Sequence, residues 1–251
     1  MVYNCLCGTQ NIVVSGGFAV LILGLQKITL LDFPDTLACT VFTGGCNFRC
    51  PFCHNAALVL TPRAEDAIPQ REVLDFLKSR QGRLEGVCIT GGEPTLHADL
   101  PDFLQEIRDL GYRIKLDSNG YRPDRLRAIL EAGLVDVVAM DVKNSPARYA
   151  ETVGLERFDL GPIQESLGLL RNGSVPYLLR TTVVKEYHTL EDIRAIGQWL
   201  AGTPKYALQS FKDSGGCIRQ DLHPVDRDTL VQMAEILRRT MGVVEIKGVD
   251  L

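Results

Sequence analysis

The chain has 251 residues, of which 45% are hydrophobic and 23% charged, and its formal net charge is −4. This composition is typical of globular proteins and excludes a disordered or fibrous chain. The slight acidic excess argues against an obligate nucleic-acid-binding protein, whose surface is usually basic. The eight cysteines are too few for a disulfide scaffold in a chain of this length. Three of them share one short loop, which indicates a metal or cofactor site in a reducing compartment.

The N-terminal part contains an apolar run, residues 12–25, that could be read as a signal peptide or a membrane span. No Lys or Arg precedes Lys27, so the positive region of a signal peptide is missing. The run is also too short to cross a bilayer. We therefore expect a cytoplasmic protein that binds neither membranes nor nucleic acid. Residues 1–19 are interpreted as an ill-defined extension, and residues 20–251 as one folded domain.

From about residue 38 the chain alternates short apolar runs with amphipathic stretches. This alternation predicts right-handed βαβ units around a parallel sheet. The expected strands cover residues 38–43, 86–90, 112–117, 135–141, 177–184, 206–211 and 243–247. The expected helices cover residues 69–80, 100–110, 122–132, 161–171, 190–200 and 225–239. Without a linker between them, these units predict a single α/β domain, a partial (β/α)6 barrel of the TIM type.

In such a barrel the functional residues lie at the C-terminal ends of the strands. Polar or small residues follow four of the expected strands: Cys46, Gly91-Gly92-Glu93, Asp117-Ser118-Asn119 and Asp141-Val142-Lys143. One such residue would have little meaning alone. Their coincidence at one rim predicts a single shared site.

The central motif is a loop in which Cys46, Cys50 and Cys53 are spaced as C-x3-C-x2-C. A structural zinc site would need a fourth ligand, and His54 is badly placed to supply it because it adjoins Cys53. Residues 50–54 also match the C-x-x-C-H pattern of c-type haem attachment, but that chemistry needs export and leaves Cys46 unexplained. Three thiolates on a four-iron cluster leave one iron open, which fits an enzyme. A noncatalytic metal-binding or electron-transfer protein is the alternative from another class.

The cysteine loop resembles the signature of the radical S-adenosylmethionine (SAM) enzymes. Its continuation into His54-Asn55, and the downstream segment Thr90-Gly91-Gly92-Glu93-Pro94-Thr95, are similar to the glycyl-radical-enzyme activating proteins. Residues 25–37, LQKITLLDFPDTL, resemble the entry to the anaerobic ribonucleoside-triphosphate reductase activating proteins. The similarity extends in order and spacing from about residue 20 to about residue 250, so it covers the whole expected domain.

The resemblance implies a [4Fe-4S] cluster held by Cys46, Cys50 and Cys53, with SAM chelating the fourth iron. One-electron reduction of the bound sulfonium would release methionine and a 5′-deoxyadenosyl radical. It further implies an oxidoreductase that generates a glycyl radical on a partner enzyme, most closely anaerobic ribonucleotide reductase, with a flavodoxin- or ferredoxin-type reductant. A radical SAM enzyme acting on a small molecule, in cofactor or modified-nucleoside maturation, is the alternative.

The resemblance also assigns contacts to SAM. Gly91 and Gly92 let the backbone approach the cofactor, while Glu93 and nearby backbone carbonyls receive the methionine ammonium. Lys143, counted with the three cysteines as catalytic, pairs with the methionine carboxylate, as a cation aimed at a carboxylate in a partly closed site should. Phe52 contacts the adenine.

Five further residues complete the predicted site, four by the same resemblance and Arg180 by its place in an apolar strand. In the pyruvate formate-lyase activators an Asp-Thr pair and a later Asp bind a monovalent cation, and Asp117, Ser118 and Asp141 occupy those places with oxygen ligands that suit a hard cation. Arg180 lies inside an apolar run and needs a carboxylate partner within a barrel, which favours a place near the cofactor. Gln209 stands where those activators carry a nucleoside-binding histidine. This departure moves the expected partner away from pyruvate formate-lyase.

The remaining histidines and cysteines receive plainer interpretations. His188 and His223 are expected to be solvated in loops. Cys39 and Cys88 lie within apolar strands and are expected to behave as small hydrophobic residues. Cys217 is expected to be a lone thiol in a flexible loop, in reach of a substrate.

Overall fold

The computed structural model describes residues 20–213 and 215–249. A curved eight-stranded sheet in the order β1 to β8 forms its centre. The strands are β1 Ile22–Thr29, β2 Ala38–Thr43, β3 Gly86–Gly91, β4 Arg113–Ser118, β5 Val137–Asp141, β6 Tyr177–Val183, β7 Lys205–Ser210 and β8 Val243–Lys247. β1 is antiparallel to β2, and each of the later strands is parallel to the one before it.

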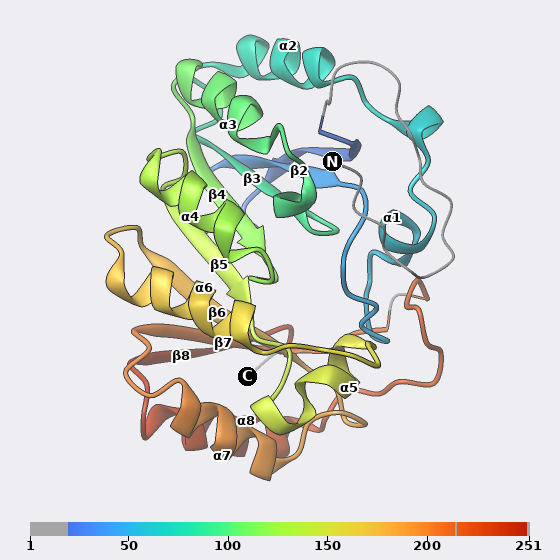
Figure 1. Cartoon of the computed structure of the whole chain (residues 1–251), viewed down its shortest axis with the longest axis vertical. Coiled ribbons are helices and arrows are strands. Elements are labelled where there is room, and N and C mark those ends of the chain that lie inside the picture. The colour runs from blue at the N-terminus through green and yellow to red at the C-terminus, as the bar shows by residue number, and fades with distance from the viewer. Residues whose placement is uncertain (1–19, 214, 250–251) are drawn as a thin grey trace.

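The helices form a layer around one face of this sheet. They are α1 Ala56–Leu60, α2 Gln70–Arg80, α3 Leu100–Asp109, α4 Pro123–Glu131, α5 Tyr149–Val153, α6 Gly161–Asn172, α7 Leu190–Trp199 and α8 Arg227–Arg238, with 3-10 turns η1 Ala64–Asp66, η2 Pro94–Leu96 and η3 Pro146–Arg148. Figure 1 shows α2, α3, α4, α6, α7 and α8 following the curve of the sheet in chain order, while α1 and α5 lie apart beside the long loops. Among the described residues, no helix has both the length and the apolar character to span a membrane.

The predicted architecture is confirmed. Six parallel βα units run from β2 to α8, and β8 follows as a further parallel strand. The predicted bounds are reproduced for β2 and β8 and differ by one or two residues elsewhere. α3 illustrates the cause, because Leu100, Phe103, Leu104 and Ile107 are all buried on one face of the helix, and Gly111 adopts the positive φ of 87° that ends the turn.

β1 has no counterpart among the strands expected from the sequence. Its pairing with β2 has register shifts near Gly24 and after Gln26, and the residues of its second half, Gln26 to Ile28, are exposed. An edge strand with bulges and one solvated end lacks the regular alternation that marks a strand in a sequence. The expected extension, residues 1–19, lies outside the described residues.

The side chains that point into the barrel determine what lies beneath the site. On four strands, the residue two positions before a predicted site residue points to the same side but one step deeper. These pairs are Lys115 before Asp117, Ala139 before Asp141, Leu178 before Arg180 and Ala207 before Gln209. Three of the deeper residues, Ala139, Leu178 and Ala207, pack together as a small apolar cluster. The floor under the site is therefore apolar there, with Lys115 as the charged exception among these four.

Candidate active site

The strand ends enclose a cavity of about 290 Å3. Every residue predicted for the site lines it: Cys46, Cys50, Phe52, Cys53, Gly91, Gly92, Glu93, Asp117, Ser118, Asp141, Lys143, Arg180 and Gln209. These residues come from the cysteine loop after β2 and from the ends of β3, β4, β5, β6 and β7. The barrel topology thus brings together side chains that are far apart in the chain, while their individual roles stay predictions.

Backbone hydrogen bonds fix the cysteine loop on both sides. The Gly45 N–H donates to the carbonyl of Leu58 at 2.7 Å, and the Arg49 N–H donates to the carbonyl of Val153 at 2.8 Å. Within the loop, the Cys53 N–H donates to the Cys50 carbonyl at 3.0 Å and closes a turn. The loop is therefore held by residues of α1 and α5, the two helices outside the main layer.

Burial raises the pKa values of all three thiols of this loop. Burial is the largest cause of the raised pKa values of Cys46, about 12, and of Cys50, about 11. A metal that binds these thiols as thiolates must therefore displace their protons. The backbone N–H of Phe48 already donates to Sγ of Cys46 at 3.4 Å, a bond that favours the thiolate.

The donor set fits a cluster bound by three cysteines. Among the described His, Cys, Asp and Glu side chains, no three converge as a single metal ion would require. A four-iron cluster makes a different demand, because each thiolate binds a separate iron atom. Nδ2 of Asn47, next to Cys46, is a buried polar atom with no partner among the described groups, and an acceptor atom of a cluster or ligand beside it would supply one.

Two glycines bring the end of β3 against the cysteine loop. A Cβ on Gly92 would lie 1.8 Å from the carbonyl oxygen of Gly45, and a Cβ on Gly91 would lie 2.3 Å from the backbone nitrogen of Thr43. Gly91 also has a φ of 116°, which side chains rarely permit. Across the same contact, the Glu93 N–H donates to the Gly45 carbonyl at 2.8 Å. The glycines are required by this backbone contact, whatever else they bind.

Glu93 is fully buried and joins two strand ends. Its carboxylate accepts hydrogen bonds from the backbone N–H and the hydroxyl of Thr95, from the Ser118 hydroxyl and from the Asn119 N–H. Burial raises the pKa of Glu93, although these donors act against the rise. The carboxylate thus ties the turn after β3 to the end of β4, in addition to lining the cavity.

Five charged side chains form an alternating row across the barrel, which we call the charge row: Lys115, Asp117, Arg180, Asp141 and Lys143. Nη1 of Arg180 lies 3.0 Å from Oδ2 of Asp117, while its Nε contacts Oδ1 of Asp141. Nζ of Lys143 lies 2.9 Å from Oδ2 of Asp141. Burial alone would raise the pKa of Asp141, but the charges of Arg180 and Lys143 outweigh it and hold that pKa below its usual range.

The predicted monovalent-cation site does not fit this arrangement. Each of the two oxygens of Asp117 faces a cationic side chain, Lys115 or Arg180, and both oxygens of Asp141 are occupied in the same way. The Ser118 hydroxyl donates to Glu93 and accepts from the Gly120 N–H. At Asp117 and Asp141 a further cation would find no carboxylate oxygen free of a positive partner, so we assign no step to it.

The other cavity residues are placed as follows. Phe52 is buried with its ring centroid 5.9 Å from that of Tyr187, and Gln209 is exposed at the cavity. Cys217, expected in a flexible loop, is instead buried, because the Arg219 N–H donates to the Pro51 carbonyl at 2.8 Å and draws that segment onto the cysteine loop. Cys39 and Cys88 are buried as expected.

The expectation that His188 is solvated was wrong. The side chain is 3% exposed, its Nδ1 accepts from the Val184 N–H at 3.0 Å, and its Nε2–H donates to the Lys143 carbonyl at 2.8 Å. The bond from the Val184 N–H favours the neutral ring, and burial lowers the pKa of His188, although its bonds to the carbonyls of Lys143 and Val184 act against this. His188 therefore holds the backbone of Lys143 in place. His223, by contrast, is exposed as expected.

Replacing His188 by glutamine should reduce the acid sensitivity of the fold. A histidine that must stay neutral when buried contributes full stability above its unfolded pKa of about 6.5, and this contribution is lost as pH falls toward the lowered folded pKa. The glutamine amide offers an acceptor and a donor but does not titrate. Between pH of about 7.5 and about 5.5, the wild type should lose about 1 kcal/mol more than the variant, measured by urea unfolding. Equal losses would contradict this.

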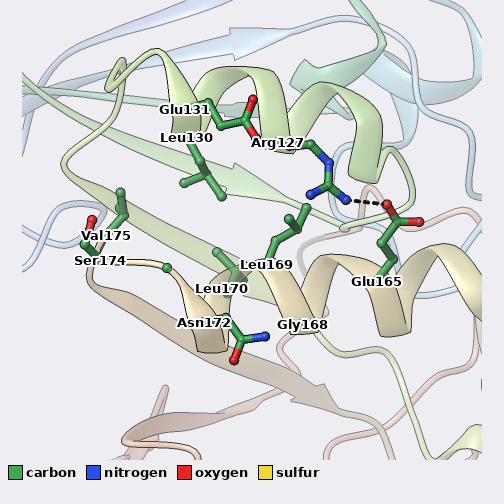
Figure 2. Close-up of a pocket in the computed structure, with 11 residues that line it drawn as sticks. Arg127, Leu130, Glu131, Glu165, Gly168, Leu169, Leu170, Asn172, Ser174 and Val175 are labelled. Carbon is green, nitrogen blue, oxygen red and sulfur yellow. Dashed lines mark hydrogen bonds and ion pairs between the residues drawn. The ribbon is translucent and has the colours of Figure 1, made fainter.

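A larger cavity, of about 570 Å3, lies elsewhere, between α4 and α6. Figure 2 shows the side chains of Leu130, Leu169 and Leu170 between the two helices, with the ion pair from Arg127 to Glu165 at one side. This cavity belongs to the outer helical layer and lacks the converging thiols and charges of the smaller one. The strand-end cavity is therefore the candidate active site.

Known proteins resemble the chain over most of its length. It is 28% identical over 235 residues, 92% of this chain and 93% of the relative, to a Methanocaldococcus jannaschii protein provisionally named a glycyl-radical enzyme activating enzyme. It is 31% identical over 141 residues to the GTP 3′,8-cyclase of Synechococcus elongatus, covering 51% of this chain and 41% of the cyclase. A radical SAM methyltransferase from Sphaerobacter thermophilus shares the fold, with a TM-score of 0.68 at 14% identity, covering 85% of this chain and 67% of that enzyme.

Residues 40–200 match the Radical SAM superfamily. The matched range includes the cysteine loop, both glycines and the whole charge row. Members of this family use a [4Fe-4S] cluster together with SAM, and the three thiols of the loop are the donors that such a cluster takes. With its barrel, its cavity and this match taken together, the chain belongs to the radical SAM superfamily.

Proposed function

We propose that this protein is a radical SAM activase that generates a glycyl radical on a partner enzyme. The observation that carries the proposal is the end-to-end match to the M. jannaschii protein, which covers 92% of this chain and 93% of that one. The match to the cyclase covers 41% of that enzyme, so it is weaker support for a function than the match to the M. jannaschii protein.

The proposed roles of the site residues follow from their chemistry. Cys46, Cys50 and Cys53 hold the cluster, and the Lys143 ammonium pairs with the methionine carboxylate. When bound, the cluster and SAM together supply a one-electron reductive cleavage that gives a 5′-deoxyadenosyl radical. The protein's own residues position the cluster and SAM and shield the radical from solvent. His188 fixes the Lys143 backbone.

The remaining cavity residues orient the other end of the cofactor. Gly91 and Gly92 keep the backbone close, and Glu93 with neighbouring carbonyls receives the methionine ammonium. Phe52 and Gln209 contact the nucleoside. Because Phe52 is buried against Tyr187 and Gln209 is exposed, the nucleoside would lie between a packed wall and the open side of the cavity.

We propose anaerobic ribonucleoside-triphosphate reductase as the partner and a flavodoxin or ferredoxin as the reductant. The supporting feature is the segment at residues 25–37, which resembles the activators of that reductase. We also propose that residues 20–251 act as one radical SAM domain, preceded by the extension at residues 1–19.

The test is an anaerobic assay with the reconstituted protein. The chain is loaded with iron and sulfide, reduced, and mixed with SAM and the candidate reductase, and the electron paramagnetic resonance spectrum is recorded. A doublet from the Cα hydrogen of a glycyl radical is expected, and it should collapse to a singlet when the reductase carries glycine deuterated at Cα. Formation of 5′-deoxyadenosine without any such signal would refute the partner assignment.

Two cysteine variants serve as a matched pair in this assay. Cys46→Ala removes a proposed cluster ligand and should abolish cluster assembly and the radical signal. Cys39→Ala removes a thiol that is fully buried in β2, outside the cavity, and should retain the full iron content and the signal. Equal iron content in the two variants would contradict the assignment of Cys46.

A small-molecule substrate is the second candidate, and the similarity to the cyclase favours it. This function predicts that 5′-deoxyadenosine forms in proportion to a nucleotide such as GTP, with no second protein present. The two functions are therefore separated by which addition, reductase or nucleotide, raises SAM cleavage above its background.

A further inference from the structure

Lys115 is a buried lysine that the proposed roles leave unused. It lies on β4 with 2% of its surface exposed, one step deeper in the barrel than Asp117. Nζ of Lys115 contacts Oδ1 of Asp117 and lies 3.7 Å from Sγ of Cys88. Lysine is almost never fully buried unless it is paired, and here its described polar neighbours are one carboxylate and one thiol.

The charge row explains why a lysine is needed at this depth. Its two carboxylates, Asp117 and Asp141, share Arg180, which bonds to one oxygen of each. The second oxygen of Asp141, Oδ2, contacts Lys143, which lines the cavity. The second oxygen of Asp117, Oδ1, contacts Lys115, which lies one step deeper in the barrel. Removing Lys115 would leave Oδ1 of the buried Asp117 carboxylate with the Cys88 thiol, 3.8 Å away, as its described neighbour in place of an ammonium, and a buried charge without a charged partner is costly.

We propose that the Lys115 ammonium is a built-in monovalent cation, which makes SAM binding by this protein independent of added sodium or potassium. Lys115 is thus a positioning residue. It neutralises Asp117 from below, so that Arg180 stays shared between the two carboxylates and Asp141 stays aligned with Lys143. The inference rests on the SAM site of the proposed function, and it holds whichever partner enzyme is activated.

A covalently attached cation differs from a bound ion in one measurable way. A bound ion is lost when its concentration falls, whereas the lysine is always present at the floor of the site. The wild type should therefore have the same SAM affinity in any monovalent salt. In a variant that lacks the Lys115 ammonium but keeps Asp117, SAM binding should require a small monovalent cation that can take the place of the ammonium.

The experiment measures SAM affinity of the reconstituted protein by equilibrium binding. Sodium, potassium, ammonium or choline chloride is used at one ionic strength, so that screening is constant. The wild type should vary by no more than about twofold among the four salts. Lys115→Met should bind SAM about tenfold more weakly in choline, the loss expected for one charge-assisted contact. Sodium, potassium or ammonium should restore most of that loss, while the larger choline ion should not.

Three further variants keep the proposal falsifiable. Lys78→Met, at an exposed lysine paired with Asp75, should bind as the wild type does in every salt. Lys115→Gln repeats the test if the methionine variant is unstable, and its thermal midpoint should rise with potassium relative to choline. Lys115→Met combined with Asp117→Asn removes the charge that attracts the cation and should show no response to salt.

Each contrary result has a definite meaning. A wild type whose SAM affinity rises about tenfold with sodium or potassium would overturn the proposal, and so would a Lys115→Met or Lys115→Gln variant indifferent to the salt. A loss of affinity in Lys115→Met that no salt restores would also overturn it, since it would mark a merely structural lysine. A wild type that binds no SAM would instead refute the cofactor site of the proposed function.

Discussion

Replacing Gly92 by alanine is expected to lower the rate of SAM cleavage by about 10²-fold, the cost of a misplacement of about 1 Å in a catalytic site. The added Cβ would lie 1.8 Å from the Gly45 carbonyl oxygen, and both groups belong to the backbone. The contact can be relieved only by separating the end of β3 from the cysteine loop. Cys46 follows Gly45 directly, so its thiol would move with the loop.

Gly168→Ala is the matched control for this prediction. Gly168 lies inside α6, and a Cβ there has no neighbour within 4 Å, so alanine should leave activity intact and stabilise the helix by about 0.5–1 kcal/mol. Iron content, SAM binding and 5′-deoxyadenosine formation are measured on both variants. If Gly92→Ala matched the wild type in all three, the two loops would not be held in the close contact described here.

Arg180→Met is expected to destabilise the fold by about 3–5 kcal/mol, the range for removing one partner of a buried ion pair. Among the described residues, the guanidinium is the one group that bonds to both Asp117 and Asp141. Without it, the buried Asp117 carboxylate and the part-exposed Asp141 carboxylate would face each other, each with a lysine only at its second oxygen. Like charges at short range disfavour the ionised forms, so the pKa of Asp141 should rise from its lowered value.

The pH dependence of this variant gives the prediction a distinctive sign. Because its carboxylates bind protons more readily, the stability difference from the wild type should shrink as pH falls from about 7.5 to about 5.5. The stability of Arg180→Lys should lie between that of the wild type and that of Arg180→Met. An ammonium keeps the positive charge but lacks the planar guanidinium that bonds to two carboxylates at once. Arg127→Met, at an exposed pair with Glu165, should cost about 0–1 kcal/mol. An Arg180→Met variant as stable as Arg127→Met would contradict the shared ion pair.

The parallel part of the fold could be read from the sequence because its signals are local. Buried strands such as β2 and β3 are continuous apolar runs, and α3 repeats its apolar residues at helical spacing. β1 had no comparable signal. Its structure depends on pairing with β2, and two register shifts and an exposed half remove the alternation that would have marked it.

The sequence predicted which residues line the candidate site, but it did not predict which of them bond to one another. Strand ends and the cysteine spacing indicated which residues meet, because a barrel collects the ends of its strands at one rim. The partners of each residue depend on distances across the barrel, which a sequence does not contain. Asp117 and Asp141 were interpreted as cation ligands, yet both are saturated by side-chain cations. A signal for Lys115 was available, since strand alternation places it on the same face as Asp117.

Within residues 20–213 and 215–249, the sheet that carries the site ends in two separate strands, β1 and β8, at opposite ends of the strand order. A closed barrel has its strand tilt and shear locked by the requirement that the last strand meet the first. An open sheet with two edge strands can instead change its curvature through small changes in the twist between neighbouring strands. The twist between paired strands varies widely among proteins without loss of pairing. An open sheet of this kind is therefore free of the closure constraint that fixes the width of a closed barrel.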